Sequence, residues 1–135
     1  MTTVARYMLD TSTVSHLLRK HPAVTRRVVA APITALCISA ITQGELLFGL
    51  ARRPDAKALH DVVWQFLRRV DVLPWDAVTS EVYGRARAAS QSQGRVIAPM
   101  DLLIGTHALS IGTVLVTSDR AFAQLPRLSV EDWTV

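Results

Sequence analysis

Four carboxylates in this chain occupy positions at which folding could bring them together. Each follows an apolar stretch or lies near the start of a predicted helix: Asp10 after residues 4–9, Glu45 after 37–41, Asp101 after 96–100 and Asp119 after 114–117. In an open α/β sheet, ligands bind outside the carboxyl ends of the strands, so acids at several strand ends converge on one crevice. Clustered carboxylates repel one another unless a cation binds them, and hard divalent cations prefer oxygen ligands. The four acids therefore predict a metal-dependent enzyme.

Each of these acids also has a purely structural interpretation. Asp10 could cap the helix that follows it, and Glu45 lies three residues after Thr42, which is the spacing of a capping box. Asp101 suits the positive end of a helix dipole, and Asp119 suits a turn. One such coincidence would mean little, whereas four at the same edge of the predicted sheet favour a shared site.

The elements that must position the acids follow from the hydrophobic pattern. Apolar runs predict strands over residues 4–9, 33–40, 70–75 and 113–117, with a short fifth strand over 128–130. Helices are predicted over residues 12–20, 22–31, 42–52, 76–93 and 101–110, together with an amphipathic helix that Asp55 caps and whose apolar face runs from Leu59 to Val70. Strands that alternate with helices predict an α/β fold with a mostly parallel sheet and right-handed crossovers. Asp76 also follows a predicted strand and is interpreted as a helix cap.

Length and composition limit the class of protein. A chain of 135 residues, half of them hydrophobic, predicts one domain with a well-filled core. The longest weakly polar stretch, residues 28–42, is too short to span a bilayer, and residues 1–8 lack the features of a signal peptide. The single cysteine, Cys37, excludes an intramolecular disulfide, predicts a reducing cytoplasmic location and is expected to be buried.

The charged residues indicate a class of partner. Fifteen Lys and Arg against eleven Asp and Glu give a net charge of +4, and thirteen of the fifteen are Arg. Arg binds phosphate bidentately and stacks on bases, so this composition favours nucleic acid. The alternative explanation is codon bias, because the chain has no Asn and only two Lys, as a GC-rich genome would produce. The histidines lack metal-binding spacing, and no phosphate-binding glycine loop or G-x-S-x-G motif is present, which argues against zinc, nucleotide-kinase and α/β-hydrolase chemistry.

Four segments around these acids resemble one known family. MLDTSTVSHLLR, ISAITQGELLFGL, PMDLLIGTHAL and LVTSDRAFAQLPRLSVEDW are similar to the PIN-domain signature of VapC toxins from type II toxin–antitoxin pairs, in the same order and at similar separations. The resemblance implies a single PIN domain over residues 1–135, with a three-layer α/β/α architecture around a four- to five-stranded sheet. It implies that Asp10, Glu45, Asp101 and Asp119 bind Mg²⁺ or Mn²⁺. The chain departs from the family at Ser12 and Ser118, where Asn is often found, and many members would begin near Met8.

The resemblance also implies an activity and partners. VapC toxins are endoribonucleases that hydrolyse RNA phosphodiester bonds with a metal-activated water, and a VapB-type antitoxin inhibits them. A homodimer and a cytoplasmic location without membrane association are expected on the same ground. Thr11, Ser12, Thr117 and Ser118 are expected to orient the carboxylates. Apolar residues on two predicted helices offer a groove for an antitoxin helix: Val14, Leu17, Leu18, Leu46, Leu47 and Leu50.

Two other classes of protein have the same arrangement of acids. A receiver-type phosphoacceptor domain also clusters acids at strand ends, but it needs a Lys near the site. The only lysines, Lys20 and Lys57, lie in predicted helices away from the strand ends. The stronger alternative is a non-catalytic, PIN-like partner-binding module with a vestigial acidic pocket, against which the four intact acids argue.

Overall fold

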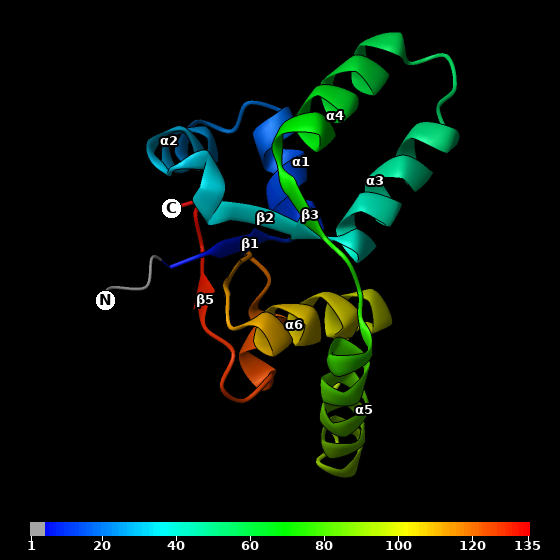
Figure 1. The fold of residues 1–135 in the computed structure, drawn as a ribbon, viewed down its shortest axis with the longest axis vertical. Coiled ribbons are helices and arrows are strands. Elements are labelled where there is room, and N and C mark those ends of the chain that lie inside the picture. The colour runs from blue at the N-terminus through cyan, green and yellow to red at the C-terminus, as the bar shows by residue number, and fades with distance from the viewer. Residues whose placement is uncertain (1–4) are drawn as a thin grey trace.

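The computed structural model describes residues 5–135, and its central feature is an open sheet of five parallel strands (Figure 1). The strands are β1 (Tyr7–Leu9), β2 (Leu36–Ser39), β3 (Asp71–Leu73), β4 (Val114–Val116) and β5 (Val130–Glu131). Their spatial order is β3-β2-β1-β4-β5, and every neighbouring pair is parallel. The chain places β2 and β3 on one side of β1 and then crosses to β4 and β5 on the other, so the strand order reverses between β1 and β4. A crevice outside the carboxyl ends of the strands at such a point is the usual ligand site of open α/β sheets.

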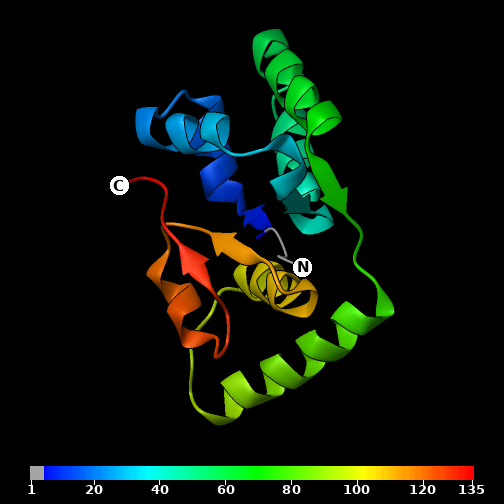
Figure 2. The same cartoon turned by 60° about the vertical axis from the view of Figure 1, so that its left-hand side comes forward.

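Helices cover both faces of the sheet. α1 (Thr11–Leu18), α2 (Pro22–Ala30), α3 (Ala40–Ala51) and α4 (Lys57–Arg69) lie on one face. α5 (Ala77–Ser92), α6 (Pro99–Ile111) and the 3₁₀ segment η2 (Arg120–Gln124) lie on the other, and α3 and α4 extend side by side away from the sheet (Figure 1 and Figure 2). The predicted three-layer α/β/α class is confirmed. None of the helices in residues 5–135 is long and apolar enough to cross a membrane.

The core divides into two halves because neighbouring strand residues point to opposite faces. On one face, the residues that pack with α1–α4 are Leu9, Ile38 and Val116. On the other face, the residues that pack with α6 and η2 are Met8, Cys37 and Leu115. All six are fully buried. Complete burial of an aliphatic side chain contributes about 1.5–3 kcal/mol, so these short central strands anchor both helical layers. The expectation that Cys37 is buried is confirmed.

Two helices begin earlier than the sequence pattern predicts, because another residue supplies the cap. α1 begins at Thr11, since Asp10 rather than Ser12 is the N-cap. α3 begins at Ala40 because the hydroxyl of Ser39 accepts a hydrogen bond from the backbone of Ile41 at 3.0 Å. The predicted helix start at residue 42 is therefore wrong. A strand that runs directly into a helix leaves no loop for a separate cap, so the residue at the end of the strand or just after it performs that function.

Several other boundaries also differ from the prediction. The predicted strand over 33–40 begins later, because Ile33–Ala35 forms a 3₁₀ turn, η1, after Pro32. α4 begins after Ala56, and Asp55 does not cap it. The fifth strand is Val130–Glu131 rather than 128–130, and α6 begins at Pro99, two residues before the predicted start. Val4, the predicted first residue of β1, lies outside the described residues.

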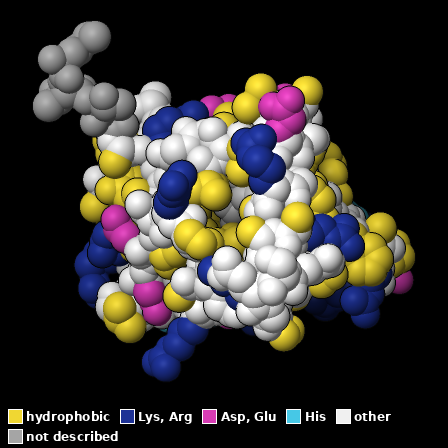
Figure 3. All heavy atoms as spheres, turned by 90° about the horizontal axis from the view of Figure 1, so that it is seen from below, with side chains coloured by type: hydrophobic (Ala, Val, Ile, Leu, Met, Phe, Trp, Pro, Cys, Tyr) yellow, Lys and Arg dark blue, Asp and Glu magenta, His cyan; other side chains and the backbone are white. Residues whose placement is uncertain are grey.

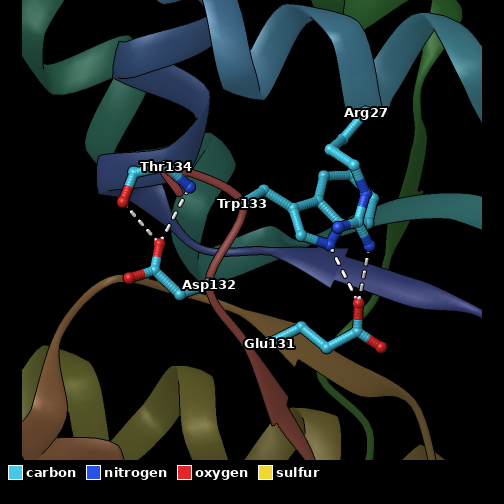
Figure 4. A network of polar contacts seen from close by, with 5 residues as sticks. All are labelled: Arg27, Glu131, Asp132, Trp133 and Thr134. Carbon is cyan, nitrogen blue, oxygen red and sulfur yellow. Dashed lines mark hydrogen bonds and ion pairs between the residues drawn. The ribbon is translucent and has the colours of Figure 1, made fainter.

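The carboxyl end of the chain is attached to α2 through Trp133 (Figure 4). The indole is 2% exposed, and its Nε1 donates to Glu131 Oε1 at 3.0 Å. The Arg27 guanidinium lies 5.0 Å from the indole ring centre and forms an ion pair with the same Glu131 oxygen at 3.0 Å. Glu131 is therefore only partly exposed and has two partners. This contact fixes β5 at the edge of the sheet.

Candidate active site

The four acids lie at the carboxyl edge of three adjacent strands, β2, β1 and β4. Asp10 directly follows β1, Asp119 follows β4 by three residues, and Glu45 lies in the second turn of α3, which begins where β2 ends. Asp101 lies in the first turn of α6. Because α6 leads into β4 and runs antiparallel to it, the first turn of α6 lies at this same edge. The predicted convergence of the acids on one edge of the sheet is therefore present.

Asp10 is fixed by the start of α1. Its Oδ1 accepts a hydrogen bond from the backbone of Thr13 at 2.8 Å, and its own backbone N donates to the Val116 carbonyl at 3.1 Å. The Thr13 hydroxyl donates to the same carbonyl at 2.9 Å and so connects α1 to β4. Asp10 is 4% exposed. The cap and the sheet together give this carboxylate one orientation, and its second oxygen has no hydrogen-bond donor among residues 5–135.

Glu45 is held by side chains rather than by a capping box. The Thr11 hydroxyl donates to Glu45 Oε1 and lies 3.3 Å from the hydroxyl of Thr42. Thr42 is fully buried and lies inside α3, so the T-x-x-E spacing does not cap this helix. Thr11 therefore connects the first turn of α1 to α3 and directs Glu45 toward the edge that Asp10 occupies. The expectation that Thr11 orients a carboxylate is confirmed.

Asp119 is the most exposed of the four acids and begins η2. Its Oδ1 accepts a hydrogen bond from the backbone of Ala121 at 2.9 Å, and its backbone N donates to the Thr117 hydroxyl at 3.0 Å. Thr117 thus fixes the backbone that carries the acid rather than the carboxylate itself. Ser12 and Ser118 are exposed, and neither makes a hydrogen bond to a carboxylate within the described part of the chain.

The electrostatics of Asp101 show that the four acids form one cluster. Burial, together with the negative charges of Asp119, Asp10 and Glu45, raises the pKa of this carboxyl to about 6. A hydrogen bond with Asp119 also favours the protonated form of Asp101. Burial and nearby negative charges both disfavour the ionised form of a carboxyl group, and both act on Asp101. The two ion pairs within residues 5–135, Arg6–Asp71 and Arg27–Glu131, include none of the four acids.

The acids interact without forming a finished set of ligands. No group of three Asp, Glu, His or Cys side chains among residues 5–135 has the arrangement needed to hold a metal ion. The raised pKa of Asp101 nevertheless shows that the four carboxyl groups lie within electrostatic range of one another.

His107 connects α6, which carries Asp101, to the start of α3, which carries Glu45. It is 1% exposed, and its Nδ1 lies 2.7 Å from the hydroxyl of Ser39, the residue that caps α3. The Trp75 ring contacts the imidazole edge-on at 5.5 Å between ring centres. Burial lowers the pKa of His107, with the charge of Asp76 opposing that effect. His107 is therefore a core residue, and Asp76 caps α5 as predicted.

Sequence reasoning did not identify Ser39 and Thr42 as part of the site's support. Both side chains are fully buried, and each contacts a residue from a distant part of the chain. Ser39 carries a recognisable signal, because a Ser between an apolar strand and a helix is a favoured N-cap. Thr42 carries none, since its contact depends on how α1 packs against α3.

Comparisons with known proteins agree with this architecture. The PIN domain family model matches residues 7–128. The chain is 33% identical to the tRNA(fMet)-specific endonuclease VapC of Shigella flexneri over 130 residues, covering 96% of this chain and 98% of that protein. It is 29% identical to the ribonuclease VapC2 of Rickettsia felis over 130 residues, covering 94% of this chain and 97% of that protein.

Solved structures of VapBC complexes show the same fold. The chain superposes on DNA-bound VapBC from Salmonella typhimurium with a TM-score of 0.89 and 32% identity, covering 96% of this chain and 99% of that one. It superposes on VapBC2 from Rickettsia felis, bound to a DNA fragment from its promoter, with a TM-score of 0.86 and 28% identity, covering 94% of this chain and 98% of that one. The family model, the curated relatives and the superpositions thus agree over nearly the whole chain, which belongs to the PIN domain family and to its VapC group.

Proposed function

We propose that this chain is a metal-dependent endoribonuclease, the toxin component of a type II toxin–antitoxin pair. The observation that carries the proposal is the cluster of Asp10, Glu45, Asp101 and Asp119 at the point where the strand order reverses. The names of the relatives support an RNA-cleaving hydrolase. The exposed arginines of the chain provide the positive charge that a polyanionic substrate needs.

The donor set fits Mg²⁺ or Mn²⁺. Four carboxylates without a paired Arg or Lys are the ligands that hard cations prefer, and they exclude the soft or imidazole-rich sites of other metals. Asp10 and Asp101 would be direct ligands, and Glu45 and Asp119 would complete the site. A divalent ion bound there supplies Lewis acidity toward a phosphodiester and acidifies water at neutral pH.

The residues of the chain itself supply orientation. The α1 cap fixes Asp10, and the Thr11 hydroxyl fixes Glu45, so both carboxylates approach the crevice from defined directions. Asp119 lies at the exposed rim, where a long single strand has access. Preorganised charges of this kind are effective because the protein does not have to rearrange during the reaction.

The test is cleavage of total RNA with Mg²⁺ or Mn²⁺, compared with the same reaction in EDTA. Asp10→Asn and Asp101→Asn should abolish cleavage while the protein stays folded. Asn is as good an N-cap as Asp, so Asp10→Asn keeps the start of α1. Asp61→Asn, an exposed acid of α4, is the matched control and should cleave at the parent rate. Full activity in either folded site variant, or activity that EDTA does not affect, contradicts the proposal.

The proposed antitoxin has a candidate docking groove on the α1, α3 and α4 side. A hollow of about 530 Å³ is lined by apolar residues of these helices, including Leu18, Leu46, Leu50 and Val62, with Glu45 at its edge. Of the apolar residues that the sequence singles out for this surface, Val14 is fully buried and belongs to the core instead. An amphipathic helix that occupied the groove would end beside the carboxylates.

Co-expression with the product of an adjacent small gene tests this partner. A soluble complex without ribonuclease activity is expected. Val62 is 39% exposed in the groove, and Val62→Glu should weaken the complex, whereas Val78→Glu on α5, at a residue 59% exposed and outside the groove, should not. Equal effects of the two substitutions contradict the groove, and a protein that is harmless alone and binds no neighbouring product contradicts the toxin assignment. Light scattering of the isolated chain tests the predicted homodimer.

A further inference from the structure

A second hollow lies between α5 and the loop that leads into α6. This α5–α6 pocket has a volume of about 290 Å³, and its walls include Tyr83, Arg87, Ser90, Arg95, Ile97 and Leu102. Pro99 is also part of the wall, so wall residues flank Asp101 within the first turns of α6. The pocket and Asp101 therefore share the first turns of α6.

The walls of the α5–α6 pocket combine positive charge with flat and apolar surface. Arg87 and Arg95 are its charged residues, and no acid lines it. The guanidinium of Arg87 donates to the Tyr83 hydroxyl at 3.1 Å, which holds both side chains at the wall. Figure 3 views the end of the molecule where α5 lies, and Lys and Arg side chains are spread over this face with hydrophobic side chains exposed between them. Proteins that bind single-stranded nucleic acid use this combination, with cations for phosphates and aromatic or apolar surface for bases.

Ser90 gives the pocket an unused hydrogen-bonding group. The residue is 4% exposed, and its hydroxyl has no partner in the structure. The neighbouring hydroxyls of Ser80 and Ser92 on the same helix donate to the carbonyls of Asp76 and Ala89. A buried hydroxyl without a partner is unfavourable and uncommon. Because Ser90 is part of the pocket wall, this unpaired hydroxyl lies directly behind the surface that a bound molecule would contact.

We propose that the α5–α6 pocket binds one nucleotide of the RNA strand, adjacent to the phosphodiester that the acid cluster cleaves. This assignment rests on the proposed ribonuclease function. Arg87 and Arg95 contact the backbone phosphate, Tyr83 and Ile97 contact the base, and the Ser90 hydroxyl bonds to a polar atom of the base or sugar. The pocket is at the small end of the range for ligand sites. It is too small for a helix of a protein partner, in contrast to the larger groove between α1, α3 and α4.

Binding is measured apart from cleavage, with a short fluorescein-labelled single-stranded RNA of random sequence in EDTA. Arg87→Gln should weaken binding about three- to tenfold and reduce the slope of log affinity against log salt by about 0.7, the value for one lost phosphate contact on a single strand. Arg85→Gln is the matched control, because Arg85 lies on the same helix and is exposed but does not line the pocket. It should leave affinity and slope close to those of the parent.

Ser90→Ala separates a binding role from a structural one. Removal of an unpaired buried hydroxyl should leave the melting temperature unchanged or higher. If the hydroxyl serves the RNA, the same variant should bind about two- to tenfold more weakly and show a higher KM with an unchanged kcat. A structural role alone would not produce this combination.

The outcomes distinguish the pocket from the proposed function. A parent that binds the RNA, with weaker binding in Arg87→Gln and Ser90→Ala, supports the pocket even if no cleavage occurs, in which case only the ribonuclease proposal fails. A parent that cleaves RNA while both variants bind and cleave like Arg85→Gln overturns the pocket and leaves the ribonuclease intact. The proposal for the pocket fails if the parent protein does not bind the RNA. It also fails if Arg87→Gln and Ser90→Ala lose antitoxin binding while their RNA binding is unchanged.

Discussion

Repulsion within the acid cluster should destabilise the metal-free protein, and Asp101→Asn should relieve it. Asn has nearly the same shape as Asp, so the substitution creates no cavity and introduces no clash. Its amide can donate to Asp119, as the protonated carboxyl of Asp101 does. The variant therefore removes one negative charge and keeps the local contacts. An increase in stability on loss of a site residue is expected where function requires an unfavourable cluster of charges.

The size of the effect follows from the pKa of Asp101, which is raised from 3.8 to about 6 by burial and by the neighbouring carboxylates. One pKa unit corresponds to about 1.4 kcal/mol, so the full shift corresponds to about 3 kcal/mol. Asp101 is partly exposed, and solvent screening reduces the expected gain to about 1–2 kcal/mol. For a domain of this size, that gain raises the melting temperature by about 3–8 °C.

The gain must depend on pH in a defined direction. The folded state binds the Asp101 proton more tightly than the unfolded state does, so ionisation costs stability as pH rises from about 4 through about 6. The Asn side chain of Asp101→Asn does not ionise, so the variant does not lose this stability. The variant should therefore match the parent below about pH 4 and exceed it by the full amount above about pH 7.

Thermal or urea unfolding in EDTA across this pH range measures the difference. Asp61→Asn on α4, an exposed acid outside the cluster, is the control and should change stability by less than about 0.5 kcal/mol at every pH. A variant no more stable than the parent at neutral pH would refute the reasoning. So would a gain that persists unchanged in acid, because it would not arise from ionisation.

Three further predictions test other parts of the structure. Millimolar Mn²⁺ should raise the melting temperature of the parent by binding the folded state, and the rise should shrink in Asp10→Asn; a thermal scan without metal dependence would count against the cation site. Trp133→Ala should lower the free energy of unfolding in urea by about 3–5 kcal/mol because the indole is buried. Arg27→Gln should lower it by less than about 1 kcal/mol because its ion pair is exposed. A loss below about 1 kcal/mol for Trp133→Ala would contradict the anchoring role of the indole. Burial raises the pKa of Cys37 to about 11, so a thiol reagent should label it only as the protein opens, and rapid stoichiometric labelling of the native protein would contradict its position.

The sequence predicts the order and type of the elements well, because short apolar strands and amphipathic helices have distinct periodicities. It predicts their boundaries poorly where two signals compete. Residues 33–35 are apolar and suit a strand, yet Pro32 begins a 3₁₀ turn there. Asp55 is a favourable cap by type, but the chain enters α4 through Ala56. Local preferences are small, and the packing of the chain decides between them.

The candidate site was also predictable from the sequence only in part. Asp10, Asp101 and Asp119 were predictable because each follows an apolar run or begins a helix, and topology then places them at one edge. Their structural and functional interpretations are not exclusive, since Asp10 and Asp119 do cap the segments that follow them. In both caps one carboxylate oxygen accepts a hydrogen bond from the backbone, and this bond leaves the other oxygen unused. A capping acid at a strand end is therefore already oriented for a ligand.

What the sequence could not supply is how the acid-bearing helices are fixed relative to one another. Thr11 joins α1 to Glu45 on α3, and His107 of α6 contacts Ser39 at the start of the same helix. These contacts join residues far apart in the chain, and none of the partners has a spacing pattern that reveals the pairing. They matter because repelling carboxylates would otherwise move apart in the metal-free protein. The supporting hydroxyls and the buried imidazole keep the cluster close enough for Asp101 to sense the other three acids.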